Sequence, residues 1–151
     1  MNNTGIQIRV LAEADLLDCS EVLIMAFKDK PWKEDWTNKE AFERLKIIAG
    51  SANSFGLVAI DGKKIIGMAL GREMIYCQRN EFWLDEFSLL PSYQHQGIAK
   101  KLFSSLKNEL SKRNIQKLFL VTRRNYHCQT FYEQEGLTQS KDDVVMGLDL
   151  N

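Results

Sequence analysis

The chain has 151 residues, the length of one domain that can bury a core of its own. Apolar residues make up 44% and charged residues 26%, as in soluble globular proteins, which argues against a disordered or fibrous chain. Twenty basic side chains balance twenty acidic ones, and this zero net charge argues against a protein that coats nucleic acid.

Cysteine content and hydrophobic runs indicate the compartment. The three cysteines are scattered without a C-x-x-C pair, so neither a disulfide framework nor a zinc site is expected. The first ten residues lack the apolar segment of a signal peptide, and no apolar run approaches the roughly 20 residues that cross a bilayer. We therefore expect a reduced, cytoplasmic protein without a membrane partner.

The first part of the chain predicts one strand followed by two helices. Residues 6–10 alternate between apolar and polar, as in a half-buried strand. Residues 15–27 change to helical spacing, and the aromatic stretch "KDKPWKEDW" follows. Thr37 and Glu40 form a capping box that begins a second helix, which Gly50 is expected to end.

The rest of the chain predicts strands around two further helices. Asp61-Gly62 is the turn signal of a hairpin between strands at 55–60 and 64–75. The later elements are a strand at 82–90, an amphipathic helix of about sixteen residues from Ile98, a short buried strand at 117–122, a helix capped by Asn125 that runs to Glu135 and is ended by Gly136, and a last strand over Val144, Met146, Leu148 and Leu150. The order β-α-α-β-β-β-α-β-α-β-β predicts one mixed α/β domain, 1–151.

The stretch "PSYQHQGIAKKLF" places small and polar residues where a strand ends and a helix begins. The first N–H groups of a helix have no partner within it and carry the positive end of its dipole. Phosphate binds there when small residues let the main chain come close. Gly97 and Ala99 supply the small positions, and Gln94 can brace the turn. By itself the pattern also suits an ordinary polar loop, and neither a Walker A loop nor G-x-G-x-x-G is present.

Two blocks resemble the GNAT family of N-acetyltransferases (general control non-repressible type). The family's phosphate loop has Gln or Arg, then Gly three residues later, then Gly or Ala two residues further on, and Gln94, Gly97 and Ala99 fit it. In the second block, "NYHCQTFYEQEGL", Asn125 precedes Tyr132 by seven residues, and a glycine with an apolar residue closes the helix. The resemblance implies an α/β (α+β) GNAT fold, with a mixed, mostly antiparallel sheet of about six to seven strands flanked by four helices.

The resemblance also implies acetyl-CoA as cosubstrate, without a metal. Its pyrophosphate would rest on the main-chain amides of 96–101. Its pantetheine arm would pair with the main chain of Leu89 and Leu90 like an extra strand, where two central parallel strands separate. Arg123 and Arg124 could touch the 3′-phosphate or lie solvated. The implied cofactor-binding residues are Leu89, Leu90, Gln94, His95, Gln96, Gly97, Ile98, Ala99, Lys100, Lys101, Asn125 and Tyr132.

Acetyl transfer to an amine needs a base for the ammonium and a proton donor for the departing thiolate. Tyr132 matches the family tyrosine that is assigned as general acid, with core packing as its alternative role. Asp85 and Glu86 are adjacent carboxylates in an apolar strand, and neighbours in a strand point to opposite faces, so at most one should face the acceptor. Glu86 is the expected base and Asp85 the alternative.

The acceptor is expected to be a small cation. Trp32 and Trp36, with Glu34 and Asp35 between them, lie in the segment that lines the acceptor cleft in this family, where they could form an aromatic, acidic pocket or a packed cover. The expected substrate-binding residues are Trp32, Trp36, Asp85 and Glu86. The sequence thus predicts an acetyl-CoA-dependent N-acetyltransferase that acts on a small primary amine by direct transfer in a ternary complex. The alternatives are a protein or peptide N-acetyltransferase and a non-catalytic CoA-binding sensor; a nucleic-acid partner is not expected, and a homodimer is left open.

Overall fold

The structure, a computed structural model, describes residues 5–151. The chain divides into two compact units, Met1–Val121 and Thr122–Asn151. Among residues 5–151, no helix combines the length and the apolar character needed to span a membrane.

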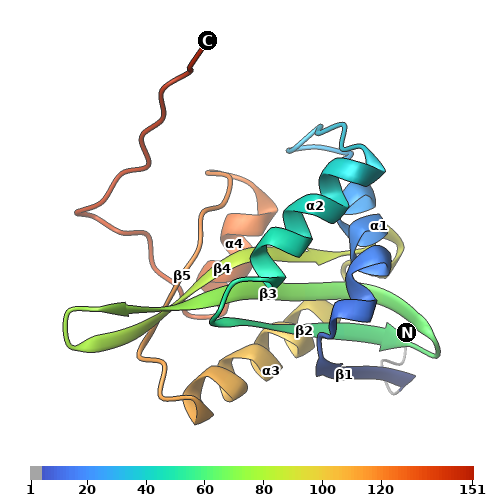
Figure 1. Ribbon diagram of the computed structural model, residues 1–151, viewed down its shortest axis with the longest axis horizontal. Helices are drawn as coiled ribbons and strands as arrows, with labels where there is room; N and C mark the ends of the chain where they lie inside the picture. Colours follow the sequence, from blue (N-terminus) through green and yellow to red (C-terminus); the bar gives the residue numbers. More distant parts are fainter. Residues whose placement is uncertain (1–4) are drawn as a thin grey trace. The chain divides into compact units, whose positions relative to one another are not determined.

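The first unit is built on a sheet whose strands follow one another in chain order (Figure 1). Each consecutive pair from β1 to β4 is antiparallel, whereas β5 is parallel to β4. The strands are β1 (Ile6–Val10), β2 (Ser54–Asp61), β3 (Lys64–Tyr76), β4 (Arg79–Leu89) and β5 (Lys117–Phe119).

Helices cover both faces of this sheet (Figure 1). The pair α1 (Leu16–Phe27) and α2 (Asn38–Ala49) lies on one face, and α3 (Ile98–Lys112) lies on the other. Short 3-10 turns, η2 (Glu13–Asp15) and η3 (Pro91–Tyr93), precede α1 and α3. Fully buried side chains from both layers form the core, among them Leu23, Leu45, Met68, Phe82 and Phe103.

The local signals of the first half of the chain are confirmed. The Thr37 hydroxyl accepts from the Glu40 N–H at 3.1 Å, and the Glu40 carboxylate accepts from the Thr37 N–H at 3.0 Å, which is a complete capping box. Gly50 is the C-cap of α2. The hairpin is also present, but Asp61 still pairs with Lys64, so Gly62 and the residue after it form the turn. Gly62 has φ of 62°, a conformation that favours glycine.

Two strands differ in length from the prediction. β4 begins at Arg79, three residues earlier than expected, because it forms a second hairpin with β3. β5 has three residues in place of six, and Leu118 and Phe119 are half-buried where a buried strand was expected. Within residues 5–151 it pairs with β4 alone, so its apolar run does not reflect a central position in the described sheet.

The second unit contains one helix, α4 (His127–Gln134), among its described residues. It ends as expected: Gly136 has φ of 98°, and the Leu137 N–H donates to the Tyr132 carbonyl at 3.0 Å. Asn125 is not the N-cap, which is Tyr126; its own N–H donates to the Gln129 side chain at 2.7 Å instead.

The predicted last strand is wrong. Residues 137–151 contain no strand in the described structure, and the alternating side chains at 144–150 are exposed. Alternation shows only which side chains could share a face, whereas a strand also needs a partner for its main-chain hydrogen bonds. The sheet therefore has five strands where six to seven were expected.

Candidate active site

The turn before α3 offers main-chain N–H groups to an anion. Gly97 is the N-cap of α3 with φ of 79°, and no side chain caps the helix. The first bond within the helix runs from the Lys101 N–H to the Gly97 carbonyl at 3.1 Å. The N–H groups of Ile98, Ala99 and Lys100 therefore point out of the first turn, where the helix dipole favours negative charge. The expected contribution of the Lys101 amide is wrong, because that N–H is used within the helix.

Side-chain hydrogen bonds fix the shape of this turn. Gln94 donates from Nε2 to the Leu89 carbonyl at 3.1 Å, which is the bracing contact expected of it. Gln96 donates from Nε2 to the Ser92 carbonyl at 3.0 Å, and the ammonium of Lys101 binds the Ile6 carbonyl of β1. His95 is exposed, with φ of 61°. The turn is thus held from both sides while the N–H groups of the helix stay directed outward.

An open strand edge lies beside this turn. β4 and β5 pair only over Glu81–Trp83 and Lys117–Phe119, so within the described first unit the rest of β4 is paired on its β3 side alone. The Leu90 N–H donates to the β3 residue Ile66 at 2.8 Å, and successive residues of a strand direct their polar groups to opposite sides. The main-chain groups of Leu89 therefore point to the open edge, where its carbonyl accepts from Gln94 and its N–H faces outward. Of the two expected partners for a pantetheine arm, Leu89 fits and Leu90 does not.

A β-bulge changes the geometry of the two carboxylates. Leu70 pairs with Glu86 and Gly71 pairs with Leu84, so Asp85 is an extra residue in β4. Directly opposed residues share a face, which puts Glu86 on the face of Leu70, and this is also the face of Arg72. Since Arg72 binds Asp85, both carboxylates are directed to this one face. The expectation that they point to opposite faces is wrong, because the bulge interrupts the alternation.

Each of the two carboxylates is paired with an arginine. Arg72 donates from Nε and Nη2 to the oxygens of Asp85 at 2.8 and 3.0 Å. Arg44 of α2 donates from Nε to Oε1 of Glu86. The sequence reasoning did not single out either of these arginines. A signal existed for Arg44, which lies three residues after the buried Ala41 and therefore beside the face of α2 that covers the sheet.

Burial dominates the ionisation of Glu86. Its side chain is about 7% exposed, and this burial raises the pKa of the carboxyl above its ordinary value of 4.5. The hydrogen bond and charge of Arg44 oppose the rise in pKa, whereas the negative charges of Asp85 and Glu34 add to it. A carboxyl with a raised pKa is a better proton acceptor near neutral pH than an ordinary glutamate.

The two tryptophans of the α1–α2 connection have different surroundings. Trp32 packs edge-on against Phe27 with ring centroids 5.1 Å apart, as a packed cover would. Trp36 donates from its indole N–H to Glu34 at 3.1 Å, and the guanidinium of Arg44 lies 5.9 Å from the centre of its ring. Trp36 is therefore linked to Glu86 through Arg44.

Tyr132 and Asn125 belong to the second unit. Tyr132 lies on α4, and its ring packs edge-on against Phe131 with centroids 5.3 Å apart. Asn125 holds the start of α4 through its main-chain bond to Gln129. The proposed roles of both residues remain predictions, as do those of Arg123 and Arg124.

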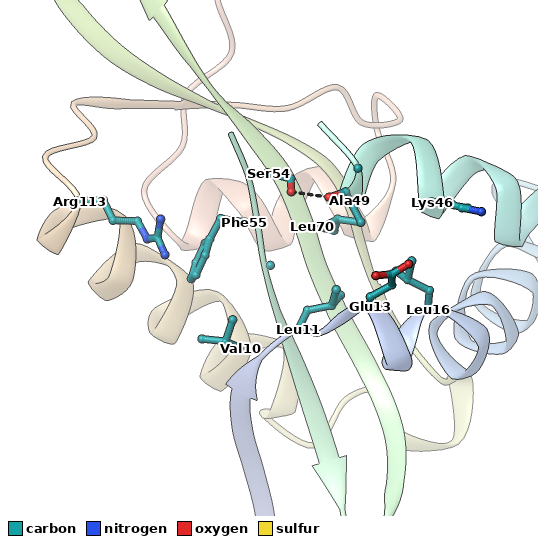
Figure 2. Close-up of a pocket in the computed structure, with 12 residues that line it drawn as sticks. Val10, Leu11, Glu13, Leu16, Lys46, Ala49, Ser54, Phe55, Leu70 and Arg113 are labelled. Carbon is teal, nitrogen blue, oxygen red and sulfur yellow. Dashed lines mark hydrogen bonds between the residues drawn. The ribbon is translucent and has the colours of Figure 1, made fainter. Parts of the chain in front are cut away.

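A surface pocket of about 430 Å³ lies elsewhere in the first unit (Figure 2). It is found at the edge of β2, beyond the end of β1, between the start of α1 and the ends of α2 and α3. Leu70, Phe55 and Arg113 are among its lining residues, and the predicted site residues are not.

Other groups that could carry chemistry do not form a centre. Cys19 is fully buried in α1, and this burial raises the pKa of its thiol to about 12, so it stays protonated at neutral pH. Among residues 5–151, no cluster of three or more His, Cys, Asp or Glu side chains is placed to hold a metal ion.

Comparison with known proteins places this geometry in a family. A family model described as the Acetyltransferase (GNAT) family matches residues 21–137. The [Ribosomal protein bS18]-alanine N-acetyltransferase of Haemophilus influenzae is 29% identical over 83 residues, which are 55% of this chain and 54% of that protein. The match thus spans about half the length of that relative.

Solved structures share the fold at low sequence identity. An aminoglycoside acetyltransferase from an uncultured soil metagenomic sample, in complex with sisomicin, has a TM-score of 0.77 at 19% identity and covers 99% of both chains. The aminoglycoside N-acetyltransferase AAC(6')-Iy in complex with CoA has a TM-score of 0.74 at 14% identity, covering 96% of this chain and 95% of that one. The ribosomal-protein-alanine N-acetyltransferase of Brucella melitensis has a TM-score of 0.74 at 16% identity, covering 95% and 99%. The family match over 21–137, together with this fold, shows that the chain belongs to the GNAT family of acetyltransferases.

Proposed function

We propose that the protein is an acetyl-CoA-dependent N-acetyltransferase that transfers the acetyl group directly to a small cationic primary amine in a ternary complex. The observation that carries this proposal is the uncapped N-terminal turn of α3 beside the open edge of β4. Family membership supports the reaction class. The choice of acceptor rests on the charged groups around Glu86.

The residues present fit acetyl-CoA. The outward N–H groups of Ile98, Ala99 and Lys100 suit a pyrophosphate, and Gly97 lets it approach the main chain. The main-chain N–H of Leu89 suits a carbonyl of an extended amide-bearing arm that lies along β4 as a further strand would. When bound, acetyl-CoA supplies an acetyl group activated as a thioester.

The chain's own residues handle the protons in this proposal. Glu86 takes a proton from the acceptor ammonium, and the neutral amine can then attack the acetyl carbonyl. As the carbon–sulfur bond breaks, Tyr132 gives its phenolic proton to the departing sulfur. The attacking nitrogen loses a second proton as the tetrahedral intermediate collapses to the amide, and this proton restores the Tyr132 phenol through solvent. Glu86 releases the first proton to solvent, so each turnover releases one proton and the enzyme returns to its starting state.

Charge supports a cationic acceptor, although less strongly than the sequence indicates. Around Glu86, the carboxylates of Glu34, Asp85 and Glu86 contribute three negative charges, and Arg44 and Arg72 contribute two positive charges. The remaining charge of minus one attracts an ammonium group. The relatives are named for aminoglycosides and for a ribosomal protein alanine, so a protein or peptide amine is the second candidate.

We also propose that residues 1–151 form one cytoplasmic N-acetyltransferase domain. The family match over 21–137 crosses the boundary between the two units at Val121, which supports a single domain. A measurement of the molecular mass in solution would show whether two copies of the chain associate.

The acceptor is tested by measuring thiol release from acetyl-CoA with a panel of amines. Polyamines and aminoglycosides should react, and acidic amino acids should not. Glu86→Gln should lower kcat and raise KM for the amine while leaving acetyl-CoA binding intact, because it removes both the base and a charge. Reaction with acidic amino acids alone, or with peptide N-termini alone, would contradict the acceptor. Binding of acetyl-CoA without thiol release from any amine would favour the CoA-binding sensor.

A further inference from the structure

The two oxygens of the Glu86 carboxylate differ in their surroundings, because Arg44 contacts only one of them. Oε1 accepts from Arg44, and among the described residues the structure gives Oε2 no hydrogen-bond partner. A carboxylate held at one oxygen keeps a fixed orientation, while the other oxygen can still accept a proton. This is the arrangement that a base in a cleft needs.

Arg44 is itself held in place by a short chain of contacts. Its guanidinium lies 5.9 Å from the ring centre of Trp36, and the indole N–H of Trp36 donates to Glu34 at 3.1 Å. The Glu34 N–H donates to the carbonyl of Phe27 at 2.8 Å, which anchors the connection to the end of α1. Contacts from α1, the connection and α2 thus converge on one oxygen of a β4 residue.

Because Glu86 is buried, its ionisation depends on the ion pair with Arg44. The side chain is about 7% exposed, and a buried carboxyl without a cation is driven to its neutral form. The charged groups that face it are Arg44 from α2, Asp85 from its own strand and Glu34 from the connection. Asp85 is itself bound by Arg72 from β3. Arg44 is therefore the only one of the facing groups that favours the carboxylate.

We propose that Arg44 is a positioning residue of the acetyl-transfer reaction, which keeps the buried Glu86 carboxylate ionised and leaves its second oxygen to the acceptor amine. This proposal rests on the proposed role of Glu86 as base. It assigns α2 a part in the chemistry, because a helix that shifted would move Arg44 off the carboxylate. It also gives Trp36 an indirect role, as the ring on which the guanidinium lies.

The test compares the pH dependence of kcat/KM in Arg44→Gln, Arg44→Lys and the unchanged protein. Arg44→Gln should move the acidic limb to higher pH by about one unit, because the carboxylate loses its neighbouring cation. Arg44→Lys keeps the charge and should restore most of that shift, with a lower kcat because the oriented N–H is lost. The carboxyl signal of Glu86 in an NMR titration should move in parallel with the limb.

Arg79→Gln is the matched control. It breaks another arginine–glutamate ion pair, in which Arg79 of β4 lies 2.7 Å from the buried Glu81 of the same strand. It should lower the melting temperature without moving the pH profile, which separates ion-pair loss from an effect on the base.

The outcomes distinguish this inference from the function on which it rests. An unshifted acidic limb and an unshifted Glu86 titration in Arg44→Gln would overturn the role of Arg44. If Glu86→Gln retains the full acidic limb, Glu86 is not the base, and an NMR shift in Arg44→Gln would then support only the electrostatic contact. Should Arg44→Gln fail to fold, Arg44→Lys and Trp36→Leu still decide, because both disturb the position of the guanidinium: an unchanged kcat and pH profile in both would overturn the proposal.

Discussion

At the scale of single residues, Glu86 and Asp15 are buried carboxyls whose pKa values move in opposite directions. Burial is the largest influence on Glu86 and raises the pKa of its carboxyl. For Asp15 the hydrogen bonds from Arg9, at 2.7 and 2.9 Å, are the largest influence and lower its pKa. The charge of Glu86 therefore reduces the free energy of unfolding as pH rises above 4.5, whereas the charge of Asp15 adds to it above 3.8.

Asp15→Asn should make the protein less stable at neutral pH and hardly less stable in acid. The native pKa of Asp15 is lowered, so its stabilising contribution is present above the unfolded value of 3.8 and is lost as pH falls through the native value. Asparagine keeps the shape and an acceptor oxygen but not the charge. Denaturant unfolding at pH 7 and near pH 3 checks this, and an equal loss at both would show that the charge is not responsible.

Ser88→Ala should raise the free energy of unfolding by about 1 kcal/mol. The Ser88 hydroxyl is buried on β4 and has no hydrogen-bond partner in the described structure, so its desolvation is uncompensated. Ser20 is the matched control, because its buried hydroxyl donates to the Leu16 carbonyl at 2.7 Å. In denaturant titrations the Ser88→Ala variant should have a higher free energy of unfolding than the Ser20→Ala variant. The opposite order would mean that the Ser88 hydroxyl has a partner in solution.

Tyr132→Phe should separate proton donation from binding. The change removes one hydroxyl and leaves the ring that packs against Phe131. Acetyl-CoA affinity should persist, while kcat should fall by roughly 10²–10⁴ if the phenol supplies the proton. Kinetics and calorimetric binding measured on the same preparation check both parts. Unchanged turnover across the pH range would leave Tyr132 a packing residue.

At the scale of elements, the turn before α3 combines a left-handed glycine with an uncapped helix start. Gly97→Glu should abolish the rise in melting temperature that acetyl-CoA produces, because the new carboxylate occupies and repels the anion site. Gly97→Ala is the control, since it carries the same backbone strain at φ of 79° without the charge. It should lower the melting temperature of the free protein and keep part of the rise. A folded Gly97→Glu variant with the full rise would disprove the anion site.

Elements with a local signal were predictable from the sequence. The capping box at Thr37, the glycine after α4 and the hairpin near Gly62 all formed because each depends on a few adjacent residues. The turn before α3 was predictable for the same reason, while its role as a phosphate site stays a prediction. Its details, such as the use of the Lys101 amide within α3, required the actual hydrogen bonds.

Features that depend on two distant segments were not predictable. The bulge at Asp85 results from pairing with β3 and reverses a conclusion drawn from strict alternation. The ion pair between Arg44 and Glu86 joins residues 42 positions apart in the chain. The pattern at 144–150 predicted a strand, yet alternation cannot supply the partner strand that such a segment needs.

At the scale of the whole molecule, the family match and the compact units have different boundaries. The match runs over 21–137 without a break, whereas the compact units meet between Val121 and Thr122. The two proposed proton-transfer residues fall on opposite sides of this boundary, Glu86 in the first unit and Tyr132 in the second. The proposed chemistry therefore requires that both units act as one domain.

Unfolding should accordingly be a single cooperative transition. All tryptophans lie in the first unit, so their fluorescence follows that unit, and hydrogen exchange of the α4 amides follows the second. Calorimetry and fluorescence should give one Tm, with equal calorimetric and van't Hoff enthalpies. Saturating acetyl-CoA should raise that Tm and slow exchange in α4 and α3 together, because a ligand that binds only the folded domain stabilises all of it. Exchange in α4 that stays fast while α3 is protected would show that the second unit opens independently, and the proposed role of Tyr132 would then fail with it.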